Sequence, residues 1–288
     1  MKHNLHAIRE GTMKVVFLLT ACISILAVAL ICIFLFANGI PTMHKIGLGK
    51  FLFGMTWAPN QNLYGIFPMI VGSLYVTAGA MIVGVPGGLL TALYFSRFAR
   101  GRTGSFLRSG VELLAGIPSV VYGFFGLVII VPFVRLLGPG TGLSVLAASL
   151  ILGIMILPTV ITVAQSALDA VPARYYEGAL ALGVDHEHAV FKVVAPAAAS
   201  GIMAAIVLGL GRAIGETMAV VMVAGNMPII PDSLLSGVRT MTANIVLEMG
   251  YAADLHREAL IATGVVLFVF ILLITMLLNV IRKRGEAR

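Results

Sequence analysis

Charge is what this sequence has least of. Only 11% of its 288 residues are Asp, Glu, Lys or Arg, whereas a soluble domain carries about a quarter. Hydrophobic residues make up 59%, and the mean hydropathy is +1.04. A water-soluble fold cannot bury that much apolar surface. The composition therefore excludes a soluble enzyme or soluble binding domain and predicts a chain embedded in membrane lipid.

Cysteine, metal-ligand clusters and nucleotide-binding motifs are also scarce. Cys22 and Cys32 both lie in the first apolar run, which indicates neither a disulfide nor a metal site. His186 and His188 have no third ligand nearby, so we expect no metal and no cofactor. No G-x-x-x-x-G-K-[ST] motif occurs, so the chain is not expected to hydrolyse ATP itself. The net charge of +7 lacks a basic run with interleaved aromatics, and we expect no nucleic-acid partner.

Apolar runs dominate what is present. A membrane core of about 30 Å takes roughly 20 helical residues to cross, and six runs are long enough. The first is longer than the apolar core of a secretory signal, so we interpret it as a retained span. We predict an all-α polytopic membrane protein. Its predicted transmembrane helices are 15-37, 69-96, 113-136, 143-165, 198-225 and 259-281. Pro86, Pro118 and Pro158 are predicted to interrupt three of them.

The distribution of basic residues predicts the orientation. With the amino terminus in the cytoplasm, thirteen basic residues lie inside and four outside, which matches the positive-inside rule. The inside set is Lys2, Arg9, Lys14, Arg97, Arg100, Arg102, Arg108, Arg174, Lys192, Arg282, Lys283, Arg284 and Arg288, and the outside set is Lys45, Lys50, Arg239 and Arg257. Both termini are therefore predicted to be cytoplasmic, in a multi-pass protein of the cytoplasmic (inner) membrane.

This orientation divides the chain into segments. We predict a cytoplasmic segment 1-14, a transmembrane domain 15-281 and a cytoplasmic tail 282-288. Within the domain, residues 38-68 form an external segment and residues 166-197 a long cytoplasmic loop. The external segment contains the single tryptophan, Trp57, which is predicted to anchor at the membrane surface, as aromatic residues often do.

The cytoplasmic loop contains residues that typically start and stop helices, in an order that predicts two short helices. Pro172 suits a first helical turn, Gly183 a helix stop, and Asp185 the cap of a second helix that Pro196 would end. In the first helix, Tyr176, Ala179, Leu180 and Gly183 recur at helical spacing. Such an apolar stripe fits a groove on a partner protein. The alternative is an amphipathic loop that rests on the membrane surface.

The fifth apolar run contains an intramembrane charge. Arg212 lies about 21 Å along the predicted helix, where a charge costs at least about 2.5 to 3.5 kcal/mol and so faces the bundle interior or a water-filled cavity. Glu216 follows one helical turn later, and Thr217 adds a hydroxyl. Arg212 and Glu216 would form either a structural ion pair or a substrate pathway. The Arg-before-Glu order is the less favourable one for a helical pair, and a guanidinium matches oxyanion geometry.

The loop sequence also resembles a known motif. Glu177-x-Ala179-x-Ala181-x-Gly183 followed by Pro196 is similar to the EAA loop of permease subunits of bacterial ABC importers. That resemblance implies a type I ABC importer permease (MetI-like) fold with six transmembrane helices. It also implies that Glu177, Ala181 and Gly183 contact a separate ATP-binding subunit.

Three further segments resemble the PstC-type permease of the bacterial phosphate importer. They are Trp57-x-Pro59 with Tyr64-Gly65, the run Glu112 to Gly123, and Leu208 to Val220 with Gly225-Asn226. The run Gly211-Arg-Ala-Ile-Gly-Glu-Thr217 is the most specific part.

The PstC-type resemblance implies a permease that translocates inorganic phosphate through a pathway containing Arg212, Glu216 and Thr217. The implied partners are a PstA-type sister permease, two PstB-type ATP-binding subunits and an external PstS-type phosphate-binding protein. The alternatives are a permease for another oxyanion, such as sulfate or molybdate, a secondary anion transporter, and an intramembrane enzyme. The last two have little support, because neither internal repeats nor an intramembrane nucleophile and base are apparent.

Overall fold

The computed structural model describes residues 2–99 and 101–286, with side chains for 12–99 and 101–280. Almost all of this part of the chain is helical, which confirms the predicted fold class. Arg100 and Arg288, and the side chains of Lys2, Arg9, Arg282, Lys283 and Arg284, lie outside the described residues.

Four helical segments are long and apolar enough to cross a membrane, and two further pairs of helices qualify if each bent pair counts as one span. The four are Thr12–Ile46, Phe67–Phe98, Val145–Asp169 and Asp254–Val280. They belong to helices α1 (Lys2–Ile46), α3 (Phe67–Leu93) with the π-helical turn η2 (Tyr94–Phe98), α7 (Val145–Asp169) and α14 (Asp254–Glu286).

The bent pairs and the short elements complete the chain. The first bent pair is α4 (Gly101–Gly116), followed by α5 (Ser119–Phe125), η3 (Gly126–Ile130) and α6 (Val131–Arg135). The second is α9 (His186–Ala189), η4 (Val190–Val194) and α10 (Ala195–Ala197), followed by α11 (Ala199–Gly215). The short elements are α2 (Leu48–Phe53), β1 (Trp57–Ala58), η1 (Pro59–Gln61), β2 (Leu63–Tyr64), α8 (Ala173–Ala181), α12 (Met218–Val223) and α13 (Met241–Met249).

The predicted interruptions have different outcomes. Pro118 does interrupt the predicted span 113-136, which bends by 101° between Gly116 and Ser119, because proline lacks an amide hydrogen and disfavours a helical residue before it. The predicted span 198-225 stops at Gly215 and resumes at Met218. In contrast, Pro86 does not interrupt α3, which continues unbroken to Leu93. Pro158 does not interrupt α7 either, so these two predictions were wrong.

The centre of the fold is the packing of α3 against α7. Small residues let the two backbones approach closely, as is typical of membrane helices. A Cβ atom on Gly84 would lie 2.5 Å from Ile156 Cγ1 and 2.7 Å from the carbonyl oxygen of Gly153. The Ser149 hydroxyl also donates to the carbonyl of Val76 at 3.3 Å. This close contact makes α3 and α7 one packed unit.

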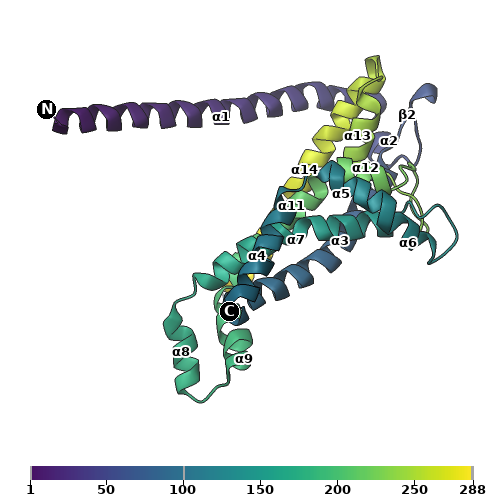
Figure 1. The fold of residues 1–288 in the computed structure, drawn as a ribbon. Coiled ribbons are helices and arrows are strands. Elements are labelled where there is room, and N and C mark those ends of the chain that lie inside the picture. Colours follow the sequence, from purple (N-terminus) through teal and green to yellow (C-terminus); the bar gives the residue numbers. More distant parts are fainter. Residues whose placement is uncertain (1, 100, 287–288) are drawn as a thin grey trace.

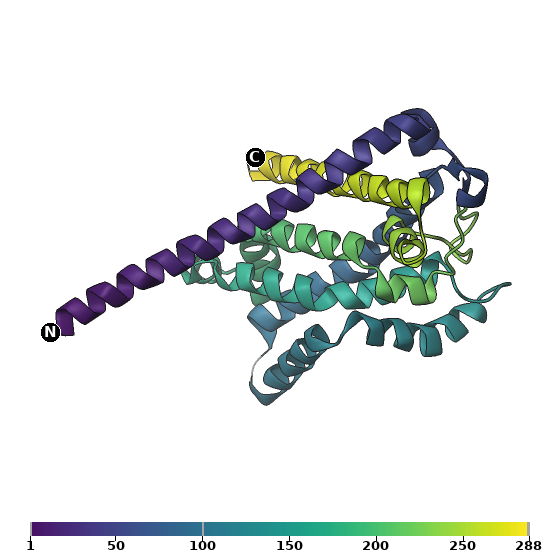
Figure 2. The same ribbon diagram turned by 90° about the horizontal axis from the view of Figure 1, so that it is seen from above.

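Helix α1 stands apart from this unit over much of its length. Its first half projects away from the other helices in both views (Figure 1, Figure 2), and the side chains of residues 12–31 are exposed within the chain. Its second half packs on α14, where the rings of Phe36 and Phe268 meet edge to face at 5.7 Å. The exposed half is therefore left for lipid or another subunit to cover.

The end of the bundle that carries the β1–β2 hairpin is held by a buried polar cluster. Trp57 is 7% exposed, and its indole nitrogen donates to Glu248 Oε2 at 2.8 Å. His256 Nε2 lies 2.8 Å from the same oxygen, and Arg239 Nη1 donates to Glu248 Oε1 at 2.6 Å. Trp57 is thus a buried contact of the fold, and the prediction that it anchors at the membrane surface was wrong.

Candidate functional site

Arg212 lies deep in the helical bundle. Helix α11 begins at Ala199, so Arg212 is about 20 Å along it. Its Nη1 donates to the Thr159 hydroxyl on α7 at 3.0 Å. The guanidinium therefore faces α7 within the bundle, as its cost in lipid requires.

The sequence predicted that Glu216 lies one helical turn beyond Arg212, and the structure contradicts this prediction. Helix α11 ends at Gly215, and Glu216 has an extended backbone (φ −70°, ψ 134°). Its Oε1 accepts a hydrogen bond from the Ala219 amide at 3.1 Å, in the first turn of α12. No ion pair joins Arg212 to Glu216 in the part of the chain with described side chains. The structural ion pair weighed from the sequence is therefore absent there.

Thr217 and a second threonine stabilise this break. The Thr217 hydroxyl donates to the Gly215 carbonyl at 3.3 Å, so it bonds backbone close to its own position. The Thr242 hydroxyl, on α13, donates to the carbonyl of Glu216 at 3.1 Å. These bonds use two of the carbonyl groups that a helix end leaves without partners. Arg212, Glu216 and Thr217 all remain partly exposed within the chain.

Sequence reasoning missed Thr159 as the partner of Arg212. Thr159 sits in an apolar run directly after Pro158, and nothing in its spacing points to a residue 53 positions later. A polar residue in the middle of an apolar span was the one available signal.

The loop 166-197, predicted to be cytoplasmic, folds as predicted at its first helix and its turn. Helix α8 follows Pro172, and Gly183 adopts φ +83°. The amides of Gly183 and Val184 donate to the carbonyls of Leu180 and Ala179 at 2.9 and 3.1 Å, the bond pattern of a glycine-terminated helix. The second helical stretch runs through Pro196 and turns only at Ala198, so the prediction that Pro196 ends it was wrong.

Asp185 caps the second helix of the loop. Its carboxylate accepts a hydrogen bond from the His188 amide at 2.8 Å. This bond, together with one to the His188 side chain, lowers the pKa of the Asp185 carboxyl below its ordinary value.

The predicted partner-contacting residues lie on the outside of the loop. Glu177, Ala181 and Gly183 are all exposed, whereas Ala179 is buried against the rest of the chain. Leu182, beside them, is 87% exposed. Helices α8 and α9 hang from one end of the bundle, away from α13 and the hairpin (Figure 1). An exposed leucine at such a tip leaves an apolar surface that water does not favour.

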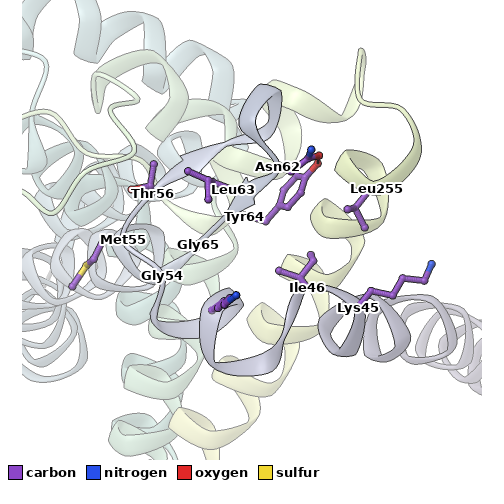
Figure 3. A pocket seen from close by; sticks show the side chains of 11 residues that line it. Lys45, Ile46, Gly54, Met55, Thr56, Asn62, Leu63, Tyr64, Gly65 and Leu255 are labelled. Carbon is purple, nitrogen blue, oxygen red and sulfur yellow. Dashed lines mark hydrogen bonds between the residues drawn. The ribbon is translucent and has the colours of Figure 1, made fainter.

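A cavity of about 450 Å³ lies at the hairpin end of the molecule (Figure 3). Its lining includes Lys45, Lys50, Asn62 and Tyr64. Lys45 also pairs with Glu258 at 3.0 Å. Because none of its lining residues contacts Arg212, this cavity is separate from the Arg212 site.

Comparison with known proteins identifies a family whose model matches most of the chain. Residues 84–286 match the family described as "Binding-protein-dependent transport system inner membrane component". The match includes the cytoplasmic loop, the Arg212 site and four of the six predicted spans.

Individual relatives agree with the family match. The chain is 37% identical to the probable ABC transporter permease protein YqgH of Bacillus subtilis, over 93% of this chain and 90% of that protein. It is 33% identical to the phosphate transport system permease protein PstC of Mesorhizobium japonicum, over 90% of this chain and 85% of that one. Among solved structures, an inward-facing MetNI methionine ABC transporter matches with a TM-score of 0.58, at 21% identity, over 80% of this chain and 99% of the other. This last likeness supports the fold alone.

Proposed function

Because the chain belongs to the family of inner membrane components of binding-protein-dependent transport systems, we propose that it translocates inorganic phosphate across the cytoplasmic membrane. As a member of this family it is a multi-pass permease component of an ABC importer, and it is not itself the ATPase. Such a permease works with ATPase subunits and an external binding protein.

The choice of phosphate rests on relatives and on one geometric observation. Relatives named phosphate permeases are 31–35% identical to the chain. The observation that carries the proposal is Arg212, a guanidinium deep in the bundle whose one hydrogen bond among described residues is to the neutral Thr159 hydroxyl. A guanidinium has five donor hydrogens in a planar fork that matches phosphate oxygens. Most of that capacity is open to a passing anion.

Glu216 and Thr217 give this site its proposed exit. An isolated guanidinium would hold phosphate too tightly for transport, because charge-assisted bonds in a site of low dielectric constant are strong. The Glu216 carboxylate, four residues away, opposes the anion and weakens its binding. Thr217 supports the break that places the carboxylate there. The residence time of the anion at Arg212 then depends on the nearby negative charge of Glu216 as well as on the size of the anion.

The cytoplasmic loop is the proposed receiver of ATP-driven movement. Glu177, Ala181 and Gly183 are exposed at the tip of the molecule, and Leu182 beside them offers apolar surface. A small residue at 181 and a left-handed glycine at 183 allow a partner to approach the backbone closely. We assign these three residues to the contact with the ATP-binding subunit.

The proposed assembly follows the phosphate relatives. It contains a PstA-type sister permease, two PstB-type ATP-binding subunits and an external PstS-type phosphate-binding protein, all surrounded by membrane lipid. Both termini, including segments 1-14 and 282-288, lie in the cytoplasm, the transmembrane domain covers 15-281, the loop 166-197 is cytoplasmic, and the segment 38-68 is external. The basic residues counted from the sequence support this orientation.

Labelled phosphate uptake tests the assignment, in cells that lack their chromosomal phosphate importer and express the complete system. Arg212→Gln should abolish uptake, and Arg212→Lys should restore little of it, because an ammonium lacks the planar fork. Arg135→Gln is the matched control, since Arg135 is an exposed basic residue with no ion pair among the described side chains. Full uptake by Arg212→Gln would refute the pathway role.

Two further arms separate the alternatives. If sulfate or molybdate at equal concentration inhibits the uptake of labelled phosphate, the substrate assignment changes from phosphate to that other oxyanion. Glu216→Gln should slow phosphate release, and unchanged uptake by this variant in a folded complex would remove Glu216 from the pathway.

Co-purification tests the loop. Glu177→Lys or Gly183→Asp should lose the ATP-binding subunit, while Glu112→Lys, an exposed carboxylate on α4, should retain it. If all three variants retain the subunit, the loop assignment is wrong.

A further inference from the structure

The inner end of α3 finishes in a π-helical turn, η2, rather than in a normal helical turn. π-helical turns are rare and occur frequently at functional sites. Side chains from two other helices hold η2 in place. The Ser96 hydroxyl donates to Asp169 Oδ1 at 2.5 Å, and Arg97 Nη2 donates to the Leu168 carbonyl at 2.9 Å, both at the end of α7. Arg108 Nη2, on α4, donates to the Phe95 carbonyl at 2.5 Å. The turn is therefore firmly tied to the bundle.

The turn η2 also contacts both helices of the cytoplasmic loop. The Phe98 ring lies 4.7 Å from the His186 ring of α9, centroid to centroid and nearly edge to face. The Arg97 guanidinium lies 5.9 Å from the centre of the Tyr176 ring of α8. The Tyr176 hydroxyl and His186 Nδ1 are 2.7 Å apart and hydrogen-bonded, so the two loop helices are also joined to each other. We refer to Arg97, Phe98, Tyr176 and His186 as the clasp.

We propose that the clasp makes α3 move together with the cytoplasmic loop, and that its four residues are positioning residues for coupling. This proposal rests on the proposed function, in which the loop receives movement from an ATP-binding subunit. The loop is covalently continuous with α7 and α11, so those helices follow it in any case. Helix α3 has no covalent link to the loop. Its inner end is bonded to α7, and the clasp adds direct contacts with both loop helices.

The packing of the bundle explains why α3 has to follow. Helices α3 and α7 approach so closely at Gly84 and Gly88 that a single added Cβ would collide with the facing side chains. Helix α7 carries Thr159, the hydrogen-bond partner of Arg212. If α7 moved while the inner end of α3 stayed behind, this close packing would resist the movement. With the clasp closed, the inner end of α3 follows the loop directly, the packed unit of α3 and α7 moves relative to α11 without internal strain, and the Arg212 site changes with each cycle.

A merely local role in folding the loop is the simpler alternative. The measurement that separates the two is the number of anions moved per ATP hydrolysed. A loop that is only less stable would lower assembly of the complex. The rate of ATP hydrolysis and the rate of anion transport would then fall together. A complex with an open clasp would still assemble and hydrolyse ATP, because Glu177, Ala181 and Gly183 are untouched, yet it would move fewer anions per ATP.

The experiment uses the complete complex in liposomes. The phosphate-loaded binding protein is placed on the side of the membrane that the external face of the complex meets. Tyr176→Phe removes the hydroxyl and keeps the ring, and His186→Phe keeps a ring against Phe98 and removes the hydrogen bond. Each should lower the transport-to-ATP ratio by about threefold or more, the scale of one net hydrogen bond. The double variant should lower it no further, because both changes delete the same bond. Tyr175→Phe, an adjacent exposed tyrosine whose hydroxyl has no partner among described residues, should match the parent.

A second arm guards against a variant that fails to fold. Phe98→Leu leaves the Tyr176–His186 bond and the Arg97–Tyr176 contact intact and removes the ring contact between η2 and His186, so it should also lower the ratio. Unchanged ratios in Tyr176→Phe and Phe98→Leu, in complexes of normal composition and thermal midpoint, would overturn the proposal. A parent complex without ATP-driven phosphate uptake would instead overturn the proposed function, and the two failures are thereby distinguished.

Discussion

The buried cluster around Glu248 should be the most sensitive point at the hairpin end of the molecule. Replacing Arg239 by methionine removes a guanidinium whose side chain is 16% exposed, next to a carboxylate that is 8% exposed. Arg239 makes three hydrogen bonds, to Glu248, to Asn244 Oδ1 at 3.1 Å and to the carbonyl of Asn226 at 2.8 Å. Methionine is of similar length but supplies none of these donors.

The expected loss of stability follows from the charge that remains. Removing one partner of a buried ion pair leaves the other charge without compensation, which costs about 3 to 5 kcal/mol. Two other donors to Glu248 persist, Trp57 Nε1 and His256 Nε2, so the expected value lies at the lower end, at about 3 kcal/mol. Adding Glu248→Gln to Arg239→Met removes the uncompensated charge. The double variant should therefore be more stable than Arg239→Met alone.

The assay is unfolding of the purified chain in mixed micelles, followed by helical circular dichroism as the fraction of sodium dodecyl sulfate is raised. Lys45→Met is the matched control, because Lys45 and Glu258 form an ion pair whose side chains are 61% and 41% exposed. Exposed pairs contribute little to stability, so this control should unfold with the parent.

Two outcomes would refute this reasoning. The first is an Arg239→Met variant that unfolds at the same detergent fraction as the parent. The second is a double variant whose loss equals the sum of the two single losses, since that would mean the two side chains do not interact in the folded state.

Three other predictions concern separate parts of the molecule. Gly84→Ala should destabilise the chain by about 1 to 3 kcal/mol through overpacking against α7, while Gly110→Ala, with nothing within 4 Å, should not; detergent unfolding measures both. Asp185→Ala should make the loop more sensitive to limited proteolysis. Because the pKa of Asp185 is lowered in the folded loop, the protection from this cap is complete above the ordinary Asp pKa and is lost as pH falls through the lowered pKa. Thr159→Val should reduce phosphate uptake and Thr159→Ser should retain it, measured with labelled phosphate.

The fold class and the loop were predictable from the sequence because their signals are local. An apolar run of about 20 residues predicts a membrane helix whatever surrounds it. In the loop, Pro172, Gly183 and Asp185 each act within one helical turn, and the structure places a helix start, a left-handed turn and a cap at these positions. Pro196 was the exception, because the helical stretch runs through it and turns two residues later, at Ala198.

The bends and the partners were not predictable, because they depend on contacts between distant segments. Hydropathy averages over a window and does not distinguish a straight span from one broken after Gly215. Proline alone did not separate the bend at Pro118 from the unbroken helices at Pro86 and Pro158. The expected pairing of Arg212 with Glu216 assumed a continuous helix, and that assumption failed. Thr159 and Trp57 were misjudged for the same reason, since their partners lie 53 and 191 positions away.

The break after Gly215 gives a physical reason why Arg212 is tolerated at its depth. Arg212 lies in the last turn of α11, where the carbonyl end of the helix dipole carries partial negative charge that favours a cation. Had the helix continued, this negative end would lie farther from the guanidinium, which would have needed a carboxylate partner instead. Because Glu216 is turned toward the Ala219 amide of α12, the stabilisation of Arg212 comes from backbone dipoles and the Thr159 hydroxyl. Neither of these neutralises the positive charge of Arg212, so we expect the guanidinium to stay available to an anion. When the anion leaves, the same two contacts still stabilise the guanidinium.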